Sequence, residues 1–299
     1  MATKRLTTAG FSYSYEFIKN EDSVFSPIFI VNGAFQSMKS WKHIISLLKE
    51  HYSIIVSDLP GWGDSDLLPS IYGFEMYNEF LREILLEESI DRVNLVSCSF
   101  GTLIATSFAK CHPTVIDNLI LCSPILKIKK SLKKEYPKMK NIIEIQNADK
   151  LAKFLCKIGL VNCKAGHKGK IDHFDILLKR FHKTISKSNP NELGKFLENT
   201  NRIMNFPQPD LGDIASMRSM VLSGCYDEFT SSKECKKVAA QFESCDIHMI
   251  PKSDHMFLHE QPVYSANMID GFLKSQCGVS ELILGLKREQ KVEMHYSSN

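Results

Sequence analysis

Through most of its length, the chain alternates short apolar segments of strand character with longer segments of helical periodicity. Four apolar runs bounded by turn residues occupy 26–33, 51–58, 92–97 and 115–123. The segments between them place apolar side chains three and four residues apart, which is the spacing of a helix with one buried face. Strands separated by helices of about 10–15 residues are typical of β-α-β units on a parallel sheet. The alternation therefore predicts an α/β fold, to which the first 20 residues add an antiparallel hairpin at the sheet edge.

The alternation stops after the fourth apolar run and resumes near residue 215. The intervening stretch contains no strand pattern, and Phe174, Leu177, Leu178, Phe181 and Ile185 form a helical apolar stripe within it. For any single residue of this stripe, we expect a place in the core rather than in a substrate pocket. An all-helical stretch inserted into an α/β sheet protein predicts a lid over the active site. The expected units are a core from 1–125 and 215–275, a helical lid at 126–214 and a tail at 276–299.

The charge of the chain is distributed unevenly. Residues 127–187 hold 17 Lys and Arg against 5 Asp and Glu, a net charge of +12, whereas the whole chain carries only +3. The small total argues against a nucleic-acid partner. The local excess is either a solvated helical face or a surface that meets an acidic partner.

The composition limits the location and the cofactors that we expect. There are nine cysteines and no C-x-x-C pair, which favours buried free thiols in a reducing compartment over a disulfide framework. No apolar run reaches the roughly 18 residues that a membrane span needs, and the first ten residues lack a signal-peptide core. No His/Cys cluster has metal-ligand spacing. We therefore expect a cytoplasmic protein with no metal and no cofactor.

The strongest chemical signal is the sequence LVSCSFGT at 95–102, at the junction of a predicted strand and a predicted helix. A nucleophile elbow needs a serine on a strained strand-to-helix turn, with small residues two positions before and after it. Ser99 has Ser97 and Gly101 in these positions, so a serine replaces the first glycine of the usual motif. The helix N-terminus also favours negative charge that develops near Ser99. The motif predicts that Ser99 is a nucleophile.

A serine nucleophile requires a histidine base and a carboxylic acid. In α/β proteins with a nucleophile elbow, the acid follows the serine in the chain, and the histidine follows the acid. Asp227 follows the predicted strand at 217–224, and His255 follows the strand at 245–250. Both loops lie at the carboxyl edge of the predicted sheet, where open α/β sheets bind ligands. We expect Asp227 to orient His255 and to stabilise its imidazolium form. Glu228 is the alternative acid and His259 the alternative base.

An oxyanion hole is expected from two backbone N–H groups, those of Phe100 and Ala34. Phe100 follows the nucleophile, and Ala34 lies in the loop after the first buried strand. The turn DLPGWGDS at 58–65 is interpreted as structural, with Trp62 as a candidate pocket wall. Cys98 and Cys225 flank the predicted site, and we interpret both as small filling residues rather than nucleophiles.

These motifs resemble those of the α/β-hydrolase superfamily over about residues 1–125 and 215–275. Within it, the chain is most similar to the acyltransferases that make the 3-(3-hydroxyacyloxy)acyl lipid of rhamnolipid synthesis. The matching residues are VNGA at 31–34, DLP and then G-x-S at 58–65, LVSxSxG at 95–101, Gly224-x-x-Asp227-Glu228 with an aromatic residue and Thr230, and His255. The resemblance thins out in the predicted lid.

The resemblance implies a mostly parallel eight-stranded sheet flanked by helices, with the lid inserted. It also implies a serine acyltransferase that joins 3-hydroxyacyl units, taken from carrier-protein or coenzyme A thioesters, through an acyl-enzyme on Ser99. An acidic acyl carrier protein would then meet the basic lid. One alternative is an ester or thioester hydrolase with water as acceptor, because the same residues serve both reactions. Another is a non-catalytic protein that only binds a ligand in this fold.

Overall fold

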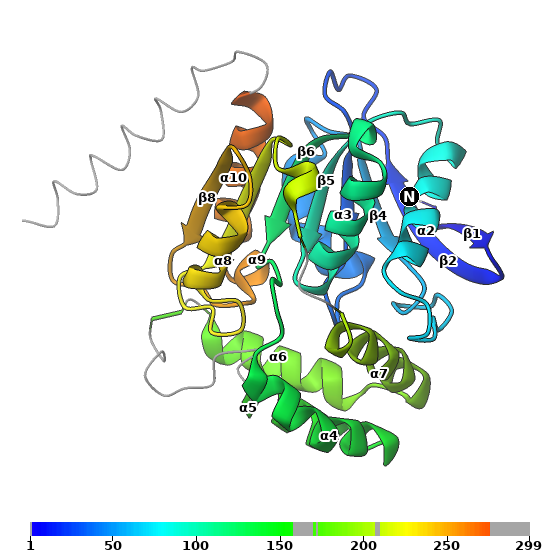
Figure 1. The fold of residues 1–299 in the computed structure, drawn as a ribbon, viewed down its shortest axis with the longest axis vertical. Coiled ribbons are helices and arrows are strands. Elements are labelled where there is room, and N and C mark those ends of the chain that lie inside the picture. Colours follow the sequence, from blue (N-terminus) through cyan, green and yellow to red (C-terminus); the bar gives the residue numbers. More distant parts are fainter. Residues whose placement is uncertain (1, 158–169, 172, 207–209, 276–299) are drawn as a thin grey trace, which may run out of the picture.

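The computed structural model describes residues 2–157, 170–171, 173–206 and 210–275. Its centre is an eight-stranded sheet with the strand order β1-β2-β4-β3-β5-β6-β7-β8. The first three strands in this order pair antiparallel, and the others pair parallel. The predicted α/β-hydrolase fold class and the hairpin at the N-terminal edge are thus confirmed (Figure 1). The strands are β1 (Lys4–Thr8), β2 (Phe11–Ile18), β3 (Ile28–Val31), β4 (Ile54–Asp58), β5 (Val93–Cys98), β6 (Ile116–Cys122), β7 (Ser219–Gly224) and β8 (Cys245–Ile250).

Helices cover both faces of the sheet, because the central strands are apolar on both sides. Alternate residues of one strand enter different cores: Phe29 and Val31 join one cluster, whereas Ile28 and Ile30 join the other. The first cluster contains side chains of α2 (Glu75–Glu87), α3 (Phe100–Cys111) and α8 (Ser232–Ala239). The second contains those of α1 (Lys42–Leu48), α9 (Phe257–Glu260) and α10 (Pro262–Lys274). Continuous apolar strands are what a parallel sheet covered on both faces requires.

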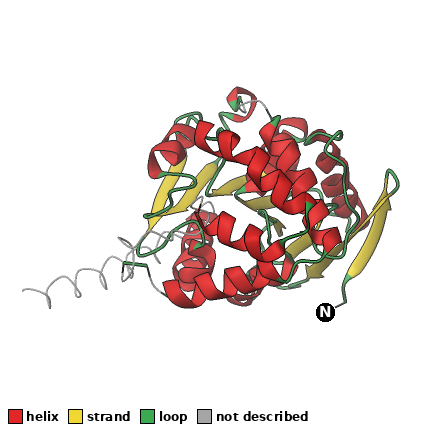
Figure 2. Ribbon diagram, turned by 90° about the horizontal axis from the view of Figure 1, so that it is seen from below, coloured by secondary structure: helices red, strands yellow, loops and turns green. Residues whose placement is uncertain are grey.

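Four described helices lie between β6 and β7: α4 (Lys130–Glu144), α5 (Ala148–Lys157), α6 (Phe174–Ser186) and α7 (Pro190–Met204). We call them the helical insertion. Figure 1 shows them together below the sheet, and Figure 2 shows them from below. They share a third apolar cluster, which also contacts Phe35 and Met256 of the core. All four fall within 126–214, while the predicted tail at 276–299 lies outside the described residues. Short 3-10 turns complete the chain at η1 (Met38–Trp41), η2 (Pro113–Val115) and η4 (Gly212–Ile214).

Helix α7 is fastened to the core by buried polar side chains. Arg202 is only 3% exposed and donates through Nη2 to the carbonyls of Leu68 (3.0 Å) and Pro69 (2.9 Å). The same guanidinium donates to the carbonyl of Tyr72 (2.7 Å), to the Tyr77 hydroxyl (3.1 Å) and to Asn199 Oδ1 (2.8 Å).

A second side chain of α7 also contacts the core. Lys195 Nζ donates to the carbonyl of Gly63 (2.8 Å). These contacts hold one wall of the insertion in a fixed position on the core.

We expect Arg202→Met to lower the free energy of unfolding by about 3 kcal/mol or more, because it leaves several buried acceptors without a donor. Urea unfolding followed by tryptophan fluorescence measures this loss. Arg82→Met is the matched control, because Arg82 lies half-buried on α2 and forms no ion pair with a described residue. Equal midpoints for the two variants would show that the Arg202 network does not hold α7.

Candidate active site

The turn between β5 and α3 holds Ser99 in a strained backbone conformation. Its φ of 50° and ψ of −115° lie outside the regions that non-glycine residues usually occupy. A Cβ on Gly101 would lie 2.6 Å from the carbonyl oxygen of Asn32, so only glycine allows α3 to approach β3 this closely. Ser97 is fully buried and its hydroxyl donates to the carbonyl of Ile120 (3.3 Å). Serine in place of the motif's first glycine is therefore accommodated by a hydrogen bond to β6.

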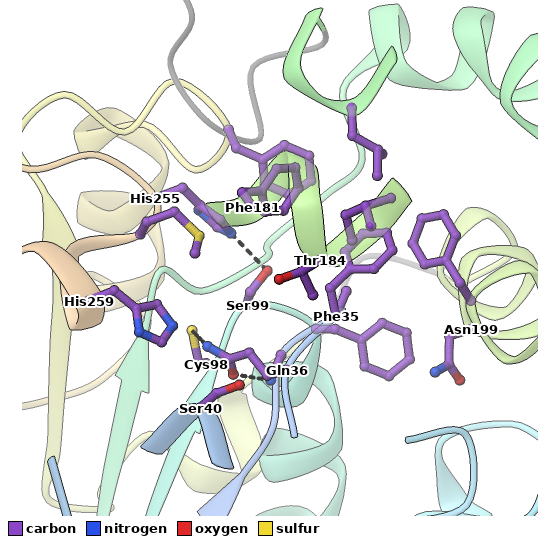
Figure 3. Close-up of a pocket in the computed structure, with 18 of the residues that line it drawn as sticks. Phe35, Gln36, Ser40, Cys98, Ser99, Phe181, Thr184, Asn199, His255 and His259 are labelled. Carbon is purple, nitrogen blue, oxygen red and sulfur yellow. Dashed lines mark hydrogen bonds between the residues drawn. The ribbon is translucent and has the colours of Figure 1, made fainter. Parts of the chain in front are cut away.

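The structure brings Ser99, His255 and Asp227 together from three different strand ends. His255 Nε2 lies 3.0 Å from Ser99 Oγ (Figure 3). On the other side of the ring, His255 Nδ1 lies 2.8 Å from Asp227 Oδ2. All three side chains are buried, with relative exposures of 8%, 8% and 5%. With Nδ1–H donating to Asp227, Nε2 is free to accept the proton of the Ser99 hydroxyl. The arrangement can activate a serine oxygen for attack on a carbonyl carbon.

The Asp227 carboxylate has a dense set of donors. Oδ1 accepts from the backbone N–H groups of Phe229 and Thr230, both at 2.8 Å. Oδ2 accepts from Thr230 Oγ1 (2.7 Å) and Ser123 Oγ (2.8 Å) in addition to His255. Burial acts to raise the pKa of Asp227, but the charge of His255 and the hydrogen bonds from His255 and Thr230 lower it below its ordinary value. The carboxylate is therefore ionised and held in one orientation.

Burial and the interaction with Asp227 also act on the pKa of His255, each in the opposite direction to its effect on Asp227. Burial acts to lower the pKa of His255, but the charge and the hydrogen bond of Asp227 raise it above its ordinary value of 6.5. The partnership therefore makes the imidazole a stronger base than free histidine. Glu228, the alternative acid, is not the carboxylate against His255. His259, the alternative base, lines the same cavity, but its pKa is lowered by burial and by Arg180 and His43.

The two expected oxyanion donors lie in the wall of one cavity with Ser99. Ala34 and Phe100 both line it, and neither backbone N–H has a hydrogen-bond partner among the described residues. Gln36 closes the Ala34 loop, because its Oε1 accepts from Gly33 N (2.7 Å) while its Nε2 approaches Cys98 Sγ (3.8 Å). Two unpaired N–H groups at this position are suited to a negatively charged oxygen.

Trp62 supports this loop from behind and does not line the cavity, so its prediction as a pocket wall is wrong. The indole Nε1 donates to the carbonyl of Gly33 (2.8 Å), and the ring packs edge-on against Phe100 at 5.2 Å between centroids. Behind it, Asp58 Oδ1 accepts from Asn32 Nδ2 (3.0 Å) and from the backbone N–H of Met38 (2.8 Å). The turn at 58–65 thus supports the loop at 33–36, and none of its residues lines the cavity. We call residues 33–36 the oxyanion loop, because they include Ala34, one of the two expected donors.

The cavity has a volume of about 490 Å³, and most of its wall is apolar. Three residues of the α6 stripe, Leu177, Phe181 and Ile185, line it. All three are buried, and Phe181 and Ile185 also belong to the apolar cluster of the insertion, so the expected place in the core is confirmed. What the expectation missed is that the same face of α6 also lines the cavity of Ser99. Phe35 packs against Phe181 at 6.2 Å between centroids, which joins the insertion to the oxyanion loop.

The two cysteines near the site differ. Burial raises the pKa of Cys98 to about 12, so this thiol stays protonated and unreactive, as a filling residue should. Cys225 is exposed, so its interpretation as a filling residue is wrong. Among the described residues, no three His, Cys, Asp or Glu side chains are grouped closely enough to hold a metal ion. No helix in the described ranges is long and apolar enough to cross a bilayer.

Several supporting residues were not predicted from the sequence. Gln36, Ser123 and Thr230 hold the oxyanion loop or Asp227, and each lies within a few residues of a motif that was recognised. Thr230 is part of the resemblance to the acyltransferases, but the resemblance does not indicate that its hydroxyl donates to Asp227. The spacing of an aspartate and a threonine three positions later is a local signal for such a turn.

Residues 26–153 match the sequence model of the alpha/beta hydrolase fold family. A pimeloyl-[acyl-carrier protein] methyl ester esterase of Pseudoalteromonas atlantica is 32% identical over 91 residues, which are 30% of this chain and 34% of the esterase. A 2-hydroxy-6-oxo-2,4-heptadienoate hydrolase of Pseudomonas putida is 29% identical over 104 residues, 33% of this chain and 38% of that enzyme. An uncharacterized protein of Mycobacterium tuberculosis is 31% identical over 96 residues, 32% of this chain and 28% of the relative. The alignments thus span about a third of the length of these relatives.

Solved structures extend the likeness to nearly the whole chain. The α/β-hydrolase MGS-M2 from a deep-sea metagenome library superposes with a TM-score of 0.78 at 21% identity, covering 90% of this chain and 96% of that one. A thermophilic esterase of Thermogutta terrifontis gives a TM-score of 0.73 at 20% identity, with coverages of 92% and 99%. The chain therefore has the α/β-hydrolase fold and carries the sequence pattern of the α/β-hydrolase superfamily over residues 26–153.

Proposed function

We propose that this protein is an enzyme that cleaves an ester or thioester through an acyl-enzyme on Ser99. The observation that carries the proposal is the continuous chain from Ser99 Oγ through His255 to Asp227, which faces a largely apolar cavity. A relative described as a methyl ester esterase supports this class of reaction, and one described as a hydrolase supports the broader class of hydrolytic enzymes. A non-catalytic binding protein needs neither this alignment nor the strained backbone of Ser99.

The reaction follows from the positions of the side chains. Ser99 Oγ attacks the carbonyl carbon while His255 Nε2 takes the hydroxyl proton, and the resulting oxyanion accepts from the N–H groups of Ala34 and Phe100. His255 then returns the proton to the departing alcohol or thiol, which leaves an acyl group on Ser99. An acceptor hydroxyl attacks the carbonyl carbon of this ester while His255 takes its proton. The bond between the acyl group and Ser99 Oγ then breaks, His255 returns the proton to Oγ, and the acylated acceptor leaves.

The acceptor in the second step decides between hydrolysis and acyl transfer. Similarity to the hydroxyacyl-lipid acyltransferases favours the hydroxyl of a second 3-hydroxyacyl unit, and the burial of Ser99 and His255 in an apolar cavity suits an acceptor other than bulk water. Mass analysis of products from 3-hydroxyacyl thioesters tests this. A product with two ester-linked units supports transfer, whereas free hydroxy acid alone supports a hydrolase.

A carrier-bound substrate is the finer part of the proposal. Lys133, Lys134 and Lys138 are exposed on α4 and would meet an acidic carrier protein. Reversing their charge together is expected to raise KM for a carrier-bound thioester and to leave KM for a small neutral thioester unchanged. Equal KM values on carrier-bound substrate before and after the change would end the docking proposal.

We expect kcat/KM to rise with pH through the pKa of His255, because only the neutral imidazole can accept the Ser99 proton. Since Asp227 raises this pKa, the transition should lie above the ordinary value of 6.5, and activity should be lost as pH falls through it. A pH profile of kcat/KM on an uncharged ester measures the transition. It should persist in His259→Gln, and its disappearance there would identify His259 as the base instead.

A further inference from the structure

Five basic side chains from three separate segments line the same cavity as Ser99. They are Lys39 on η1, Lys42 and His43 at the start of α1, Arg180 on α6 and His259 on α9. We call them the cationic mouth. All but the half-buried His259 are open to solvent, so the group lies where the cavity meets water. Both the core and the helical insertion contribute to it.

The positive charge of the cationic mouth comes from Lys39, Lys42 and Arg180. Burial, Arg180 and His43 lower the pKa of His259, so His259 is a neutral hydrogen-bonding group at neutral pH that lies close to both. Of the described residues that line the cavity, none is Asp or Glu. The five also form no ion pair with any described residue, whereas Lys129 and Lys153 pair with Glu234 and Asp149.

The rest of the cavity has the opposite character. Leu132, Met139 and Leu155 of the insertion line it, and Phe35 and Phe196 stack at 4.0 Å between centroids. Figure 3 shows His259 to one side of Ser99, and Phe35 with Asn199 to the other. His259, which Arg180 and His43 approach, and the aromatic ring of Phe35 therefore lie on different sides of the nucleophile in one continuous cavity.

We propose that the cationic mouth binds an anionic group, a carboxylate or a phosphate, on one arm of the substrate while the other arm is apolar. The inference rests on the proposed function of Ser99 and names the class of its substrate: an amphiphilic ester or thioester with a negative charge on one side of the scissile carbonyl. An uncompensated group of cations at the entrance of an apolar cavity would both attract such a molecule and set its direction of entry.

Each exposed charge contributes little by itself, so the effect must come from the group. We expect wild type to favour an anionic substrate over its neutral isostere by about tenfold or more in kcat/KM, since several charge-assisted hydrogen bonds are available. Rising ionic strength should reduce this preference, because the mouth is open to solvent.

The test compares matched thioesters that differ only in charge. The octanoyl thioester of 3-mercaptopropionate is compared with that of 3-mercaptopropanamide, and octanoyl phosphopantetheine with octanoyl pantetheine. A preference in the first pair alone identifies a carboxylate, and one in the second pair alone identifies a phosphate. Equal kcat/KM values within both pairs would overturn the inference.

Substitutions in the cationic mouth then test whether its residues cause the preference for the anionic thioester. Arg180→Gln should lower the ratio of anionic to neutral kcat/KM by about threefold, and the triple change Lys39→Gln, Lys42→Gln, Arg180→Gln by about tenfold. Lys183→Gln is the matched control, because Lys183 is exposed on the same helix and does not line the cavity. An unchanged ratio in the triple variant, or an equal fall in the control, would contradict the proposal.

A binding measurement separates this inference from the proposed chemistry. The thioethers 3-(octylthio)propionate and 3-(octylthio)propanamide cannot be cleaved, so calorimetric titration of wild type and the triple variant reports on the mouth alone. Tighter binding of the carboxylate by wild type, lost in the triple variant, supports the site even where no substrate is turned over. Equal affinities refute the site and leave the role of Ser99 untouched.

Discussion

Ser99→Ala is expected to lower kcat on an ester or thioester substrate by about 10⁵–10⁶-fold. The loss is large because His255 and Asp227 act only through the hydroxyl that accepts the acyl group. Without Ser99 Oγ, 3.0 Å from His255 Nε2, no covalent intermediate forms. What remains is the rate supplied by binding and by the N–H groups of Ala34 and Phe100.

The measurement is a steady-state rate combined with intact-protein mass analysis after rapid quenching. Wild type should show the added mass of one acyl group, and Ser99→Ala should show none. Ser107→Ala is the control, because this serine lies on the same helix and its hydroxyl accepts from Asn78 rather than lining the cavity. Acylated protein in the Ser99 variant would mean that another side chain is the nucleophile.

Much of this fold was predictable because its signals are local. Apolar runs with turn residues at their ends gave six of the eight strands, and the strand-to-helix junction placed Ser99. Asp227 and His255 were found by combining chain order with strand ends, since the carboxyl ends of parallel strands meet at one edge. The geometry that the structure adds is the contact between these loops.

The residues that escaped prediction depend on tertiary approach. Nothing in the turn at 58–65 indicates that the Trp62 indole reaches the carbonyl of Gly33, because that requires knowing how two strand-end loops lie. The apolar stripe of α6 has the same pattern whether it packs into a core or faces a cavity. The proximity of Arg180 to His43 and His259 could not be predicted either, because Arg180 lies in the insertion and both histidines lie in the core.

The burial of Arg202 is a further case of this kind. Arg202 lies in the predicted lid but outside the lysine-rich segment 127–187, and the structure buries it among neutral acceptors. The sequence alone does not show that this cation is structural. Structural and exposed cations therefore have to be told apart. The buried hydrogen bonds of Arg202 hold α7 on the core, whereas the lysines of α4 are exposed to solvent.

We expect Asp227→Asn to lower kcat by about 10⁴-fold with the fold intact. The donors around the side chain dictate which way the new amide points. The backbone N–H groups of Phe229 and Thr230 both donate to Oδ1, so the amide oxygen must take that position. The amide NH₂ then takes the place of Oδ2, 2.8 Å from His255 Nδ1.

An amide donor at this position reverses the tautomer of His255. Nδ1 must accept from the NH₂ group, so the ring proton moves to Nε2, which can no longer take the proton of Ser99. The variant also loses the negative charge that raises the pKa of His255, so its remaining base is weaker. The kcat of the variant, its unfolding midpoint and its pH profile together measure these effects.

Glu228→Gln is the control for this substitution, because it removes the neighbouring carboxylate in the same loop. It should retain most of the wild-type kcat, while Asp227→Asn should show both the low kcat and a low-pH transition displaced to lower pH. A larger loss in Glu228→Gln would make Glu228 the acid that orients His255. Equal retention in both variants would mean that Ser99 needs no carboxylate behind its base, and the relay through Asp227 would have to be abandoned.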